Sequence, residues 1–252
     1  MSPGNPTLSS LRVGVVQFPG SNCDDDCVDV LNRHFGITAP KIWHTERTLP
    51  KLDALIIPGG FSFGDYLRSG ALAARSPVVE PIRSFAQKGG AILGICNGFQ
   101  ILTESQLLPG ALLQNRDLQF ICKMTKIKHP GGKVLALPIA HGEGRYWISE
   151  IDLRALEDQD MIAYQYCSDE GLLDFAANPN GSAANIAGIY SKNKRILGMM
   201  PHPERAADDL MGGSHDSLQV LRDFLAKIYR GITPCITLLT PRPSNIWQSR
   251  NG

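Results

Sequence analysis

Short apolar runs alternate with amphipathic segments along the first hundred residues. Residues 11–17, 54–58 and 91–95 are apolar almost throughout, and residues 41–45 form a further short run. Strands without a polar face belong to a largely parallel sheet whose two faces are covered by helices. We therefore expect an α/β fold with a largely parallel, twisted sheet in this half of the chain.

Three helices are predicted beside these strands. Apolar positions recur at helical spacing in residues 78–88 and 97–105, and a third helix begins after a cap at Ser21 or Asn22 and ends at Gly36. The glycine-rich segments that separate strands from helices lie at the carboxyl ends of the predicted strands. Ligands of open α/β sheets bind at these ends, so we expect the functional residues there.

The second half of the chain has a different pattern. Five strand-like segments with partial alternation occur at residues 118–128, 133–139, 161–167, 183–190 and 195–200. Alternation is typical of antiparallel strands with one solvated face, so these segments predict an antiparallel extension of the sheet. Residues 214–229 then form an amphipathic helix.

The length of 252 residues suits one α/β domain, and a hydrophobic content of 43% excludes disorder across the whole chain. We expect a single domain over residues 11–231. Residues 1–10 are predicted to be a flexible extension. Residues 232–252, with three prolines and no apolar period, are predicted to be a disordered tail.

Charge and cysteine content narrow the class of protein. The formal net charge is +1, from 25 basic and 24 acidic residues, which argues against a dedicated nucleic-acid binder. No apolar run is long enough to span a membrane, and the first residues do not resemble a signal peptide. The six cysteines are too sparse for a disulfide scaffold and include no CxxC pair, so we expect reduced thiols, no metal site and a cytoplasmic protein.

The segment Gly94-Ile-Cys-Asn-Gly98 has the G-x-nucleophile-x-G form of a nucleophile elbow and lies between a predicted strand and a predicted helix. Such a turn exposes the nucleophile, here Cys96, and the start of the helix favours its thiolate. The backbone N–H of the next residue is an oxyanion donor. The alternative is a buried structural cysteine beside packing glycines.

A thiol nucleophile needs a base, and the base needs a group that orients it. Of the six histidines, His202 lies in the sequence Pro201-His-Pro-Glu204, directly after a predicted strand. The prolines stiffen the backbone, and Glu204 is close enough to bond one ring nitrogen and leave the other for a thiol. The alternative is a loop histidine beside an unrelated glutamate.

The pair of Cys96-Asn-Gly-Phe-Gln100 and a distant His-Pro-Glu sequence resembles the class I, triad-type glutamine amidotransferases. Four longer motifs resemble the glutaminase subunits of phosphoribosylformylglycinamidine synthase: Pro19-Gly-Ser-Asn-Cys-Asp24, Pro58-Gly-Gly-Phe-Ser-Phe-Gly-Asp-Tyr-Leu-Arg68, Gly94-Ile-Cys-Asn-Gly-Phe-Gln100 and Ala140-His-Gly-Glu-Gly-Arg-Tyr146. The resemblance covers roughly residues 11–229. It implies a flavodoxin-like fold of the amidotransferase type.

The resemblance implies a catalytic triad. Cys96 would attack the carboxamide of L-glutamine, His202 would act as base and then acid, and Glu204 would orient His202. Hydrolysis of the resulting thioester would release glutamate and ammonia.

Further positions carry roles by the same resemblance. Gly60 and Asn97 would donate backbone N–H groups to the oxyanion, and Gln100 would help to hold the substrate. The glycine-bounded loop with His141, Arg145 and Tyr146 is a candidate contact with the substrate or with a partner. Without the resemblance, a solvated surface loop explains it equally well.

The resemblance also implies partners. Ammonia would pass to a large ATP-dependent synthetase subunit, with a small accessory subunit, which forms formylglycinamidine ribonucleotide from formylglycinamide ribonucleotide in de novo purine synthesis. The segment Gly131-Gly-Lys133 lacks the spacing of a phosphate loop. We therefore expect no cofactor in this chain, with ATP and magnesium on the synthetase, and no nucleic acid or membrane as partner.

Two other functions remain open from the residues alone. A γ-glutamyl cysteine hydrolase would use the same elbow and triad, and a non-catalytic α/β binding scaffold would not need them intact. Asn97 and the loop over residues 142–146 favour the amidotransferase. Cys23 and Cys27 are four residues apart, which allows a metal pair, but we favour a helix-cap region with one core cysteine.

Overall fold

The computed structural model describes residues 8–207 and 215–232. Its α-helices are α1 (Asp24–Phe35), α2 (Val79–Gln87), α3 (Asn97–Glu104), α4 (Glu150–Asp158) and α5 (His215–Ile232). Its strands are β1 (Val13–Gln17), β2 (Lys41–Trp43), β3 (Ala54–Ile57), β4 (Ala91–Ile95), β5 (Ala111–Leu113), β6 (Ile121–Lys128), β7 (Val134–His141), β8 (Arg145–Trp147), β9 (Ile162–Tyr166), β10 (Ile186–Tyr190) and β11 (Ile196–Met199).

Within these residues, nine strands form one mixed sheet in the order β2-β1-β3-β4-β11-β10-β9-β6-β7. The neighbours from β2 to β11 are parallel, and those from β11 to β7 are antiparallel. This arrangement confirms the predicted α/β fold and its antiparallel extension. Strands β5 and β8 form a separate antiparallel pair.

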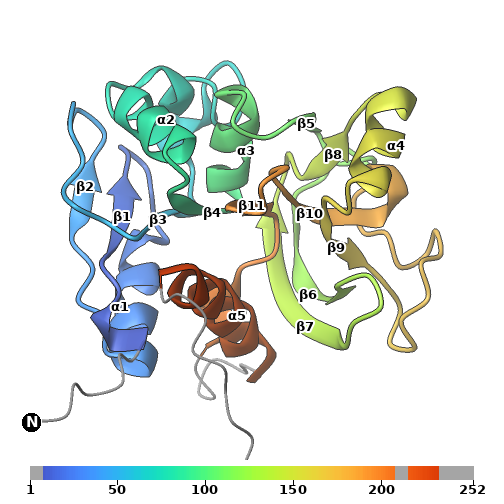
Figure 1. The fold of residues 1–252 in the computed structure, drawn as a ribbon. Helices are drawn as coiled ribbons and strands as arrows, with labels where there is room; N and C mark the ends of the chain where they lie inside the picture. Colours follow the sequence, from blue (N-terminus) through green and yellow to red (C-terminus); the bar gives the residue numbers. More distant parts are fainter. Residues whose placement is uncertain (1–7, 208–214, 233–252) are drawn as a thin grey trace, which may run out of the picture.

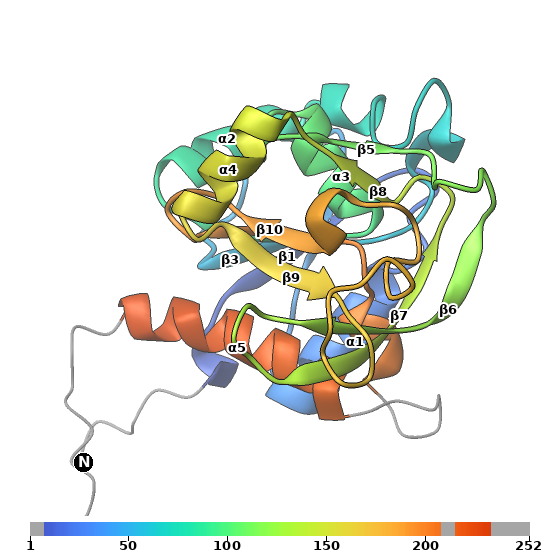
Figure 2. The same ribbon diagram turned by 90° about the vertical axis from the view of Figure 1, so that its right-hand side faces the viewer.

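Helices cover both faces of the sheet. In both views α1 and α5 lie on one side of it, and α2, α3 and α4 lie on the other (Figures 1 and 2). Strands β3, β4, β10 and β11 are buried at every position, which explains their continuous apolar sequences. In β7, at the edge of the sheet, buried and half-buried positions alternate instead.

Local sequence signals explain the C-terminal end of α1 but not its N-terminal end. Gly36 ends α1 in the left-handed conformation, with φ of 66°, as predicted. The predicted cap at Ser21 or Asn22 is wrong, because Cys23 occupies the N-cap position and makes no side-chain capping bond. The side-chain oxygen of Asn22 instead accepts from the Cys23 thiol at 3.2 Å.

Three elements have no counterpart in the predictions. Strands β5 and β8 have three residues each, too few to show a period. Helix α4 buries only Leu156, so it lacks a visible apolar stripe, although the Ser149 side chain accepts from the backbone of Asp152 and caps it.

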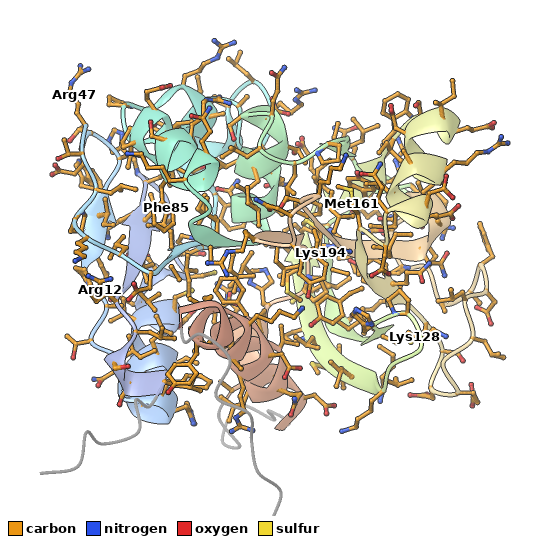
Figure 3. All side chains as sticks on the ribbon, in the orientation of Figure 1. Arg12, Arg47, Phe85, Lys128, Met161 and Lys194 are labelled. Atoms are coloured by element: carbon orange, nitrogen blue, oxygen red, sulfur yellow. The ribbon has the colours of Figure 1, made fainter. Side chains whose placement is uncertain are left out.

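Figure 3 shows Lys128, the last residue of β6, which donates to the carbonyl of Gly171 in the loop after β9.

The described chain starts ahead of the predicted domain. Leu8–Ser10 form a short 3-10 helix, and Leu8 packs against the core before residue 11 is reached. Residues 1–7 and 233–252, where the flexible extension and most of the disordered tail are predicted, lie outside the described residues. None of the described helices is both long and apolar enough to cross a membrane.

Candidate active site

Four loops that follow parallel strands meet at one edge of the sheet. They come after β1, β3, β4 and β11, which are neighbours, and they carry Cys23, Gly60, Cys96 and His202. All four residues line one cavity of about 170 Å³. The carboxyl ends of the strands thus bring together residues that are up to 179 positions apart in the sequence.

Cys96 occupies a strained turn between β4 and α3. Its backbone has φ of 49° and ψ of −105°, a conformation that costs on the order of 1–3 kcal/mol for a residue with a side chain. The turn is held because its N–H donates to the carbonyl of Met199 at 2.7 Å, while its own carbonyl accepts from Phe99 and Gln100 in the first turn of α3. The thiol contacts the carbonyl of Ala140 at 3.7 Å.

The two glycines of the elbow are required by packing. A Cβ at Gly98 would overlap the carbonyl oxygen of Ile57 in β3. A Cβ at Gly94 would collide with Leu102 and lie 2.8 Å from the carbonyl oxygen of Gly98. The chain therefore turns sharply at Cys96 only because neither flanking position carries a side chain.

His202 is fixed through both its backbone and its ring. Its N–H donates to the carbonyl of Pro138 at 2.9 Å, and Nδ1 lies 2.6 Å from Oε1 of Glu204. Both side chains are almost fully buried. Nε2 is buried and has no hydrogen-bond partner among the described residues.

The charge state of His202 follows from its surroundings. Burial alone would lower its pKa, but the Glu204 carboxylate and the sulfur atoms of Cys96 and Cys23 raise the pKa well above the usual histidine value. The Glu204 carboxylate beside Nδ1 thus favours the charged form of the imidazole. His202 and Cys96 line the same cavity.

Cys23 also belongs to this site, although the sequence favoured a helix-cap role for it over a metal pair with Cys27. Its sulfur lies 4.0 Å from Nδ1 of His202, and burial, offset in part by this contact, raises the pKa of the thiol. One donor atom each of Cys23, His202 and Glu204 lie within 4.8 Å of one another. The site thus has two thiols beside one imidazole and one carboxylate. Cys27 is buried in the core below it.

Of the two predicted oxyanion residues, Gly60 lines the cavity, and Asn97 follows the lining residue Cys96. Gly60 has φ of 134°, and a Cβ there would lie 2.8 Å from the backbone nitrogen of Asn22, so a side chain is excluded. An isolated bridge pairs Gly60 with Ser21 and joins the loops after β1 and β3. Asn97 is the first residue of α3, so its backbone N–H has no acceptor within the helix.

Gln100 does not line this cavity. Its Oε1 accepts from the side chain of Asn97 at 2.9 Å, and its Nε2 donates to the carbonyl of Glu143 at 2.6 Å. Both ends of the buried amide are thus occupied. Gln100 thus connects α3 to the loop after β7, and its predicted contact with substrate stays a prediction.

The loop over residues 141–146 is an internal structure. His141 is buried, and burial together with the charge of His202 lowers its pKa to about 4. Asn115 holds its Nδ1 at 3.0 Å and accepts from the backbone of Gly144. The prediction that Tyr146 contacts a partner or substrate is wrong, because its ring is buried against Phe99 and its hydroxyl donates to Pro109.

Two residues of this loop, Glu143 and Arg145, reach a surface hollow. They line a cavity of about 340 Å³ together with Leu67 and Arg68. The Glu143 carboxylate accepts from the backbone of Ser69, which ties this hollow to the loop after β3.

Comparisons with known proteins agree with this geometry. The family described as CobB/CobQ-like glutamine amidotransferase domain matches residues 10–219. The chain is 48% identical over 215 residues to the phosphoribosylformylglycinamidine synthase subunit PurQ of Gloeobacter violaceus, covering 81% of this chain and 93% of the relative. It is 46% identical to PurQ of Aquifex aeolicus, covering 86% of this chain and all of the relative.

Solved structures give the same result. A chain of the PurLQS structure from Thermotoga maritima matches with a TM-score of 0.74 and 37% identity, covering 86% of this chain and 99% of that one. A glutamine amidotransferase from Thermotoga maritima matches with a TM-score of 0.51 at 13% identity, covering 89% of this chain and 86% of that one. At this low identity the second match indicates a shared fold alone.

Proposed function

The chain belongs to the CobB/CobQ-like glutamine amidotransferases, as a glutaminase subunit of phosphoribosylformylglycinamidine synthase in purine biosynthesis, and from this premise we propose how its residues carry out the reaction. Cys96 is the nucleophile, His202 the acid and base, and Glu204 the group that orients His202. The main observation behind this assignment is that the two ring nitrogens of His202 differ. Nδ1 is bound to Glu204, and Nε2 has no hydrogen-bond partner among the described residues.

The reaction begins with the thiol proton of Cys96 on Nε2 of His202, a state that the raised pKa of His202 favours. The sulfur attacks the carboxamide carbon of L-glutamine, and the carbonyl electrons move onto the oxygen. When this tetrahedral species collapses, the C–N bond breaks and Nε2 gives its proton to the nitrogen, which leaves as ammonia. Water then attacks the thioester with His202 as base, releasing glutamate and restoring the thiol.

Cys96 is favoured over Cys23 as the nucleophile for two reasons. Cys23 faces Nδ1, which Glu204 already occupies, so no free nitrogen of His202 is directed at it to take its proton. Burial also raises the pKa of the Cys23 thiol, which disfavours its thiolate. Cys96 stands at the start of α3, where the helix dipole favours negative charge.

The developing oxyanion is stabilised by backbone groups. The N–H of Asn97 follows the nucleophile, and Gly60 borders the same cavity. One such donor typically contributes a factor of ~10²–10³ to the rate. Backbone N–H groups bind the oxyanion without any side chain, which is consistent with the exclusion of side chains at Gly60 and Gly98 by packing.

Ammonia is then used by other subunits. The relative from Thermotoga maritima is part of a PurLQS structure, and we infer that this chain likewise partners a large ATP-dependent synthetase and a small accessory subunit. ATP and magnesium act on the synthetase, which converts formylglycinamide ribonucleotide to its amidine, and the complex works in the cytoplasm. Phe61 and Phe120, both exposed, line the cavity and supply apolar surface for docking around its mouth.

Affinity labelling tests the assignment. A glutamine analogue with an electrophilic group in place of the amide should modify Cys96, and Cys96→Ala should abolish both labelling and glutamine hydrolysis. Cys23→Ala is the matched control, since its thiol lies in the same cavity. Peptide mapping that finds Cys23 as the main adduct in the unmodified sequence would reverse the roles of the two cysteines.

A further inference from the structure

The proposed reaction leaves one buried thiol of the active site without a task. Cys23 is 1% exposed and sits at the N-cap of α1, yet it makes no capping bond. Its thiol donates to the side-chain oxygen of Asn22 at 3.2 Å, and its sulfur lies 4.0 Å from Nδ1 of His202. A structural cysteine in the core would be expected to contact apolar groups, as Cys27 does one turn later.

The surroundings of Cys23 have the composition of a metal site. Donor atoms of one thiol, one imidazole and one carboxylate lie within 4.8 Å of one another. Sulfur, imidazole nitrogen and carboxylate oxygen are the ligands of Zn²⁺, which binds them at about 2.0–2.3 Å in tetrahedral geometry. Separations of this size therefore require only small movements of the side chains around one ion.

One further observation points to a ligand at this place. Oε2 of Glu204 is buried and has no hydrogen-bond partner among the described residues. Buried polar groups without partners are uncommon and call for an explanation.

We propose that Cys23, His202 and Glu204 form a site for Zn²⁺, and that the ion inhibits the glutaminase when it binds there. Coordination replaces the thiol proton of Cys23 and the Nδ1 proton of His202, and both protons pass to solvent without any redox change. Water completes the tetrahedron. The ion separates Glu204 from its orienting contact with His202, so the acid–base cycle stops while Cys96 remains unmodified.

The site is reached through the cavity already described, because Cys23 and His202 both line it. Inhibition should therefore be reversible. Zn²⁺ added to the unmodified protein should abolish glutamine hydrolysis, and a chelator should restore it. Inhibition that persists after complete chelation would contradict a coordination site and indicate damage to the fold.

A direct binding experiment separates this site from the nucleophile. In Cys96→Ala, which cannot hydrolyse glutamine, isothermal titration should detect one Zn²⁺ per active site, and Co²⁺ should give a thiolate-to-cobalt charge-transfer band. Adding Cys23→Ser should remove the band and weaken binding at least about tenfold, the scale at which even indirect supports of metal sites act. Adding Cys122→Ser, which changes an exposed cysteine, should leave both signals intact.

Two outcomes would overturn the proposal. Unchanged binding in Cys96→Ala with Cys23→Ser would exclude Cys23 as a ligand, and absence of binding in Cys96→Ala alone would show that the nucleophile is the metal-binding thiol. Circular dichroism on each variant establishes that it is folded. Because these readouts use a protein without the proposed nucleophile, they are independent of the assignment of the catalytic reaction.

Discussion

The two ring nitrogens of His202 have different surroundings, and the chemistry of the site depends on this difference. Glu204 holds Nδ1 at 2.6 Å, so the ring cannot rotate without breaking a buried ion pair. In the proposed reaction, Nε2 transfers the proton, and Glu204 acts through His202 without itself moving a proton.

Substitution of the pair should separate orientation from proton transfer. Glu204→Gln keeps the shape of the side chain, whereas His202→Ala removes the acid and base. The fold-decrease in kcat should therefore be at least about ten times smaller for Glu204→Gln than for His202→Ala. KM for glutamine should change less than kcat in both. Steady-state kinetics on folded protein decide this, and an effect of His202→Ala on KM alone would assign His202 to binding.

The lowered pKa of His141 should make the stability of the folded chain depend on pH. Its folded pKa of about 4 lies below the unfolded value of ~6.5, so between these values the unfolded chain binds the additional proton. Its contribution to the free energy of unfolding is therefore constant above pH ~6.5 and is lost, by about 3 kcal/mol, as the pH falls toward 4.

Urea unfolding of the unmodified sequence and of His141→Gln measures this loss. The glutamine does not titrate, so the difference between the two unfolding free energies should shift in favour of the variant as the pH is lowered from 6.5 to 4. All other groups cancel to first order. A pH-independent difference would mean that His141 is not held neutral by burial.

The positions of site residues could be predicted from the sequence where they depend only on the course of the backbone. The elbow glycines and the Pro-His-Pro-Glu segment follow from strand, turn and spacing. Cys23 and Gln100 could not be placed, because their positions depend on partners from other elements: the His202 ring for the first and the Glu143 carbonyl for the second. Cys23 had one usable signal, its position in the loop after a predicted parallel strand.

At the level of elements, the contact between α3 and β3 sets the shape of the elbow. Helix α3 starts directly after Cys96, and its second residue, Gly98, lies against the carbonyl of Ile57 at the end of β3. The helix can approach the sheet this closely only through a glycine. The strained backbone conformation of Cys96 is therefore maintained by packing between α3 and β3 and not by the turn itself.

Gly98→Ala tests this statement. Its methyl group would overlap a backbone atom, so α3 must move away from β3, at a cost of about 1–3 kcal/mol or more. The hydrolytic activity should fall with it, since the nucleophile is displaced. Gly142→Ala is the control, because its Cβ would meet only Phe120 at 3.9 Å, and its unfolding free energy should stay within about 0.5 kcal/mol. Equal denaturation midpoints for the two variants would contradict the packing argument.

The predicted elements are those that pack on the large sheet. The apolar runs of β1, β3 and β4 and the amphipathic pattern of α5 follow from burial, so the sequence indicates them directly. Strands β5 and β8 are stabilised by each other across more than thirty residues of intervening chain, which no local pattern reveals. Helix α4 is mostly exposed and depends on its cap.

At the scale of the whole molecule, the two halves of the sheet meet at the mouth of the active site. Phe61 follows β3 in the parallel half, Phe120 precedes β6 in the antiparallel half, and their ring centroids lie 6.5 Å apart. The mouth could not be predicted from the sequence, because it depends on the order of strands in the sheet. Its rim is apolar on both sides.

Half of the large exposed apolar side chains lie in two segments, and one residue of each segment, Phe61 or Phe120, lines this cavity. Within the described residues, twelve large hydrophobic side chains are exposed, and six of them belong to two segments, residues 61–67 and 118–124. Leu67 is 89% exposed and Tyr66 is 74% exposed. Large exposed apolar patches of this kind mark protein interfaces. In the proposed function, the synthetase that uses the ammonia would cover this opening and prevent loss of the product to solvent.

Leu67→Asp should therefore weaken binding of the chain to its synthetase. Leu67 has φ of 70°, a conformation that aspartate adopts more easily than leucine, so the substitution does not strain the folded subunit. Loss of one buried leucine corresponds to about 1.5–3 kcal/mol, or roughly a tenfold to hundredfold rise in Kd, measured by titration calorimetry on the reconstituted complex.

The matched control for this variant is Ile151→Asp. Ile151 is 81% exposed, but it lies in the first turn of α4, away from both apolar segments, where an acid is favoured by the helix dipole. Because Leu67 does not line the catalytic cavity, glutamine hydrolysis by the free variant separates docking from chemistry. Equal Kd values for Leu67→Asp and the unmodified chain would remove residues 61–67 from the interface and place the synthetase elsewhere on the molecule.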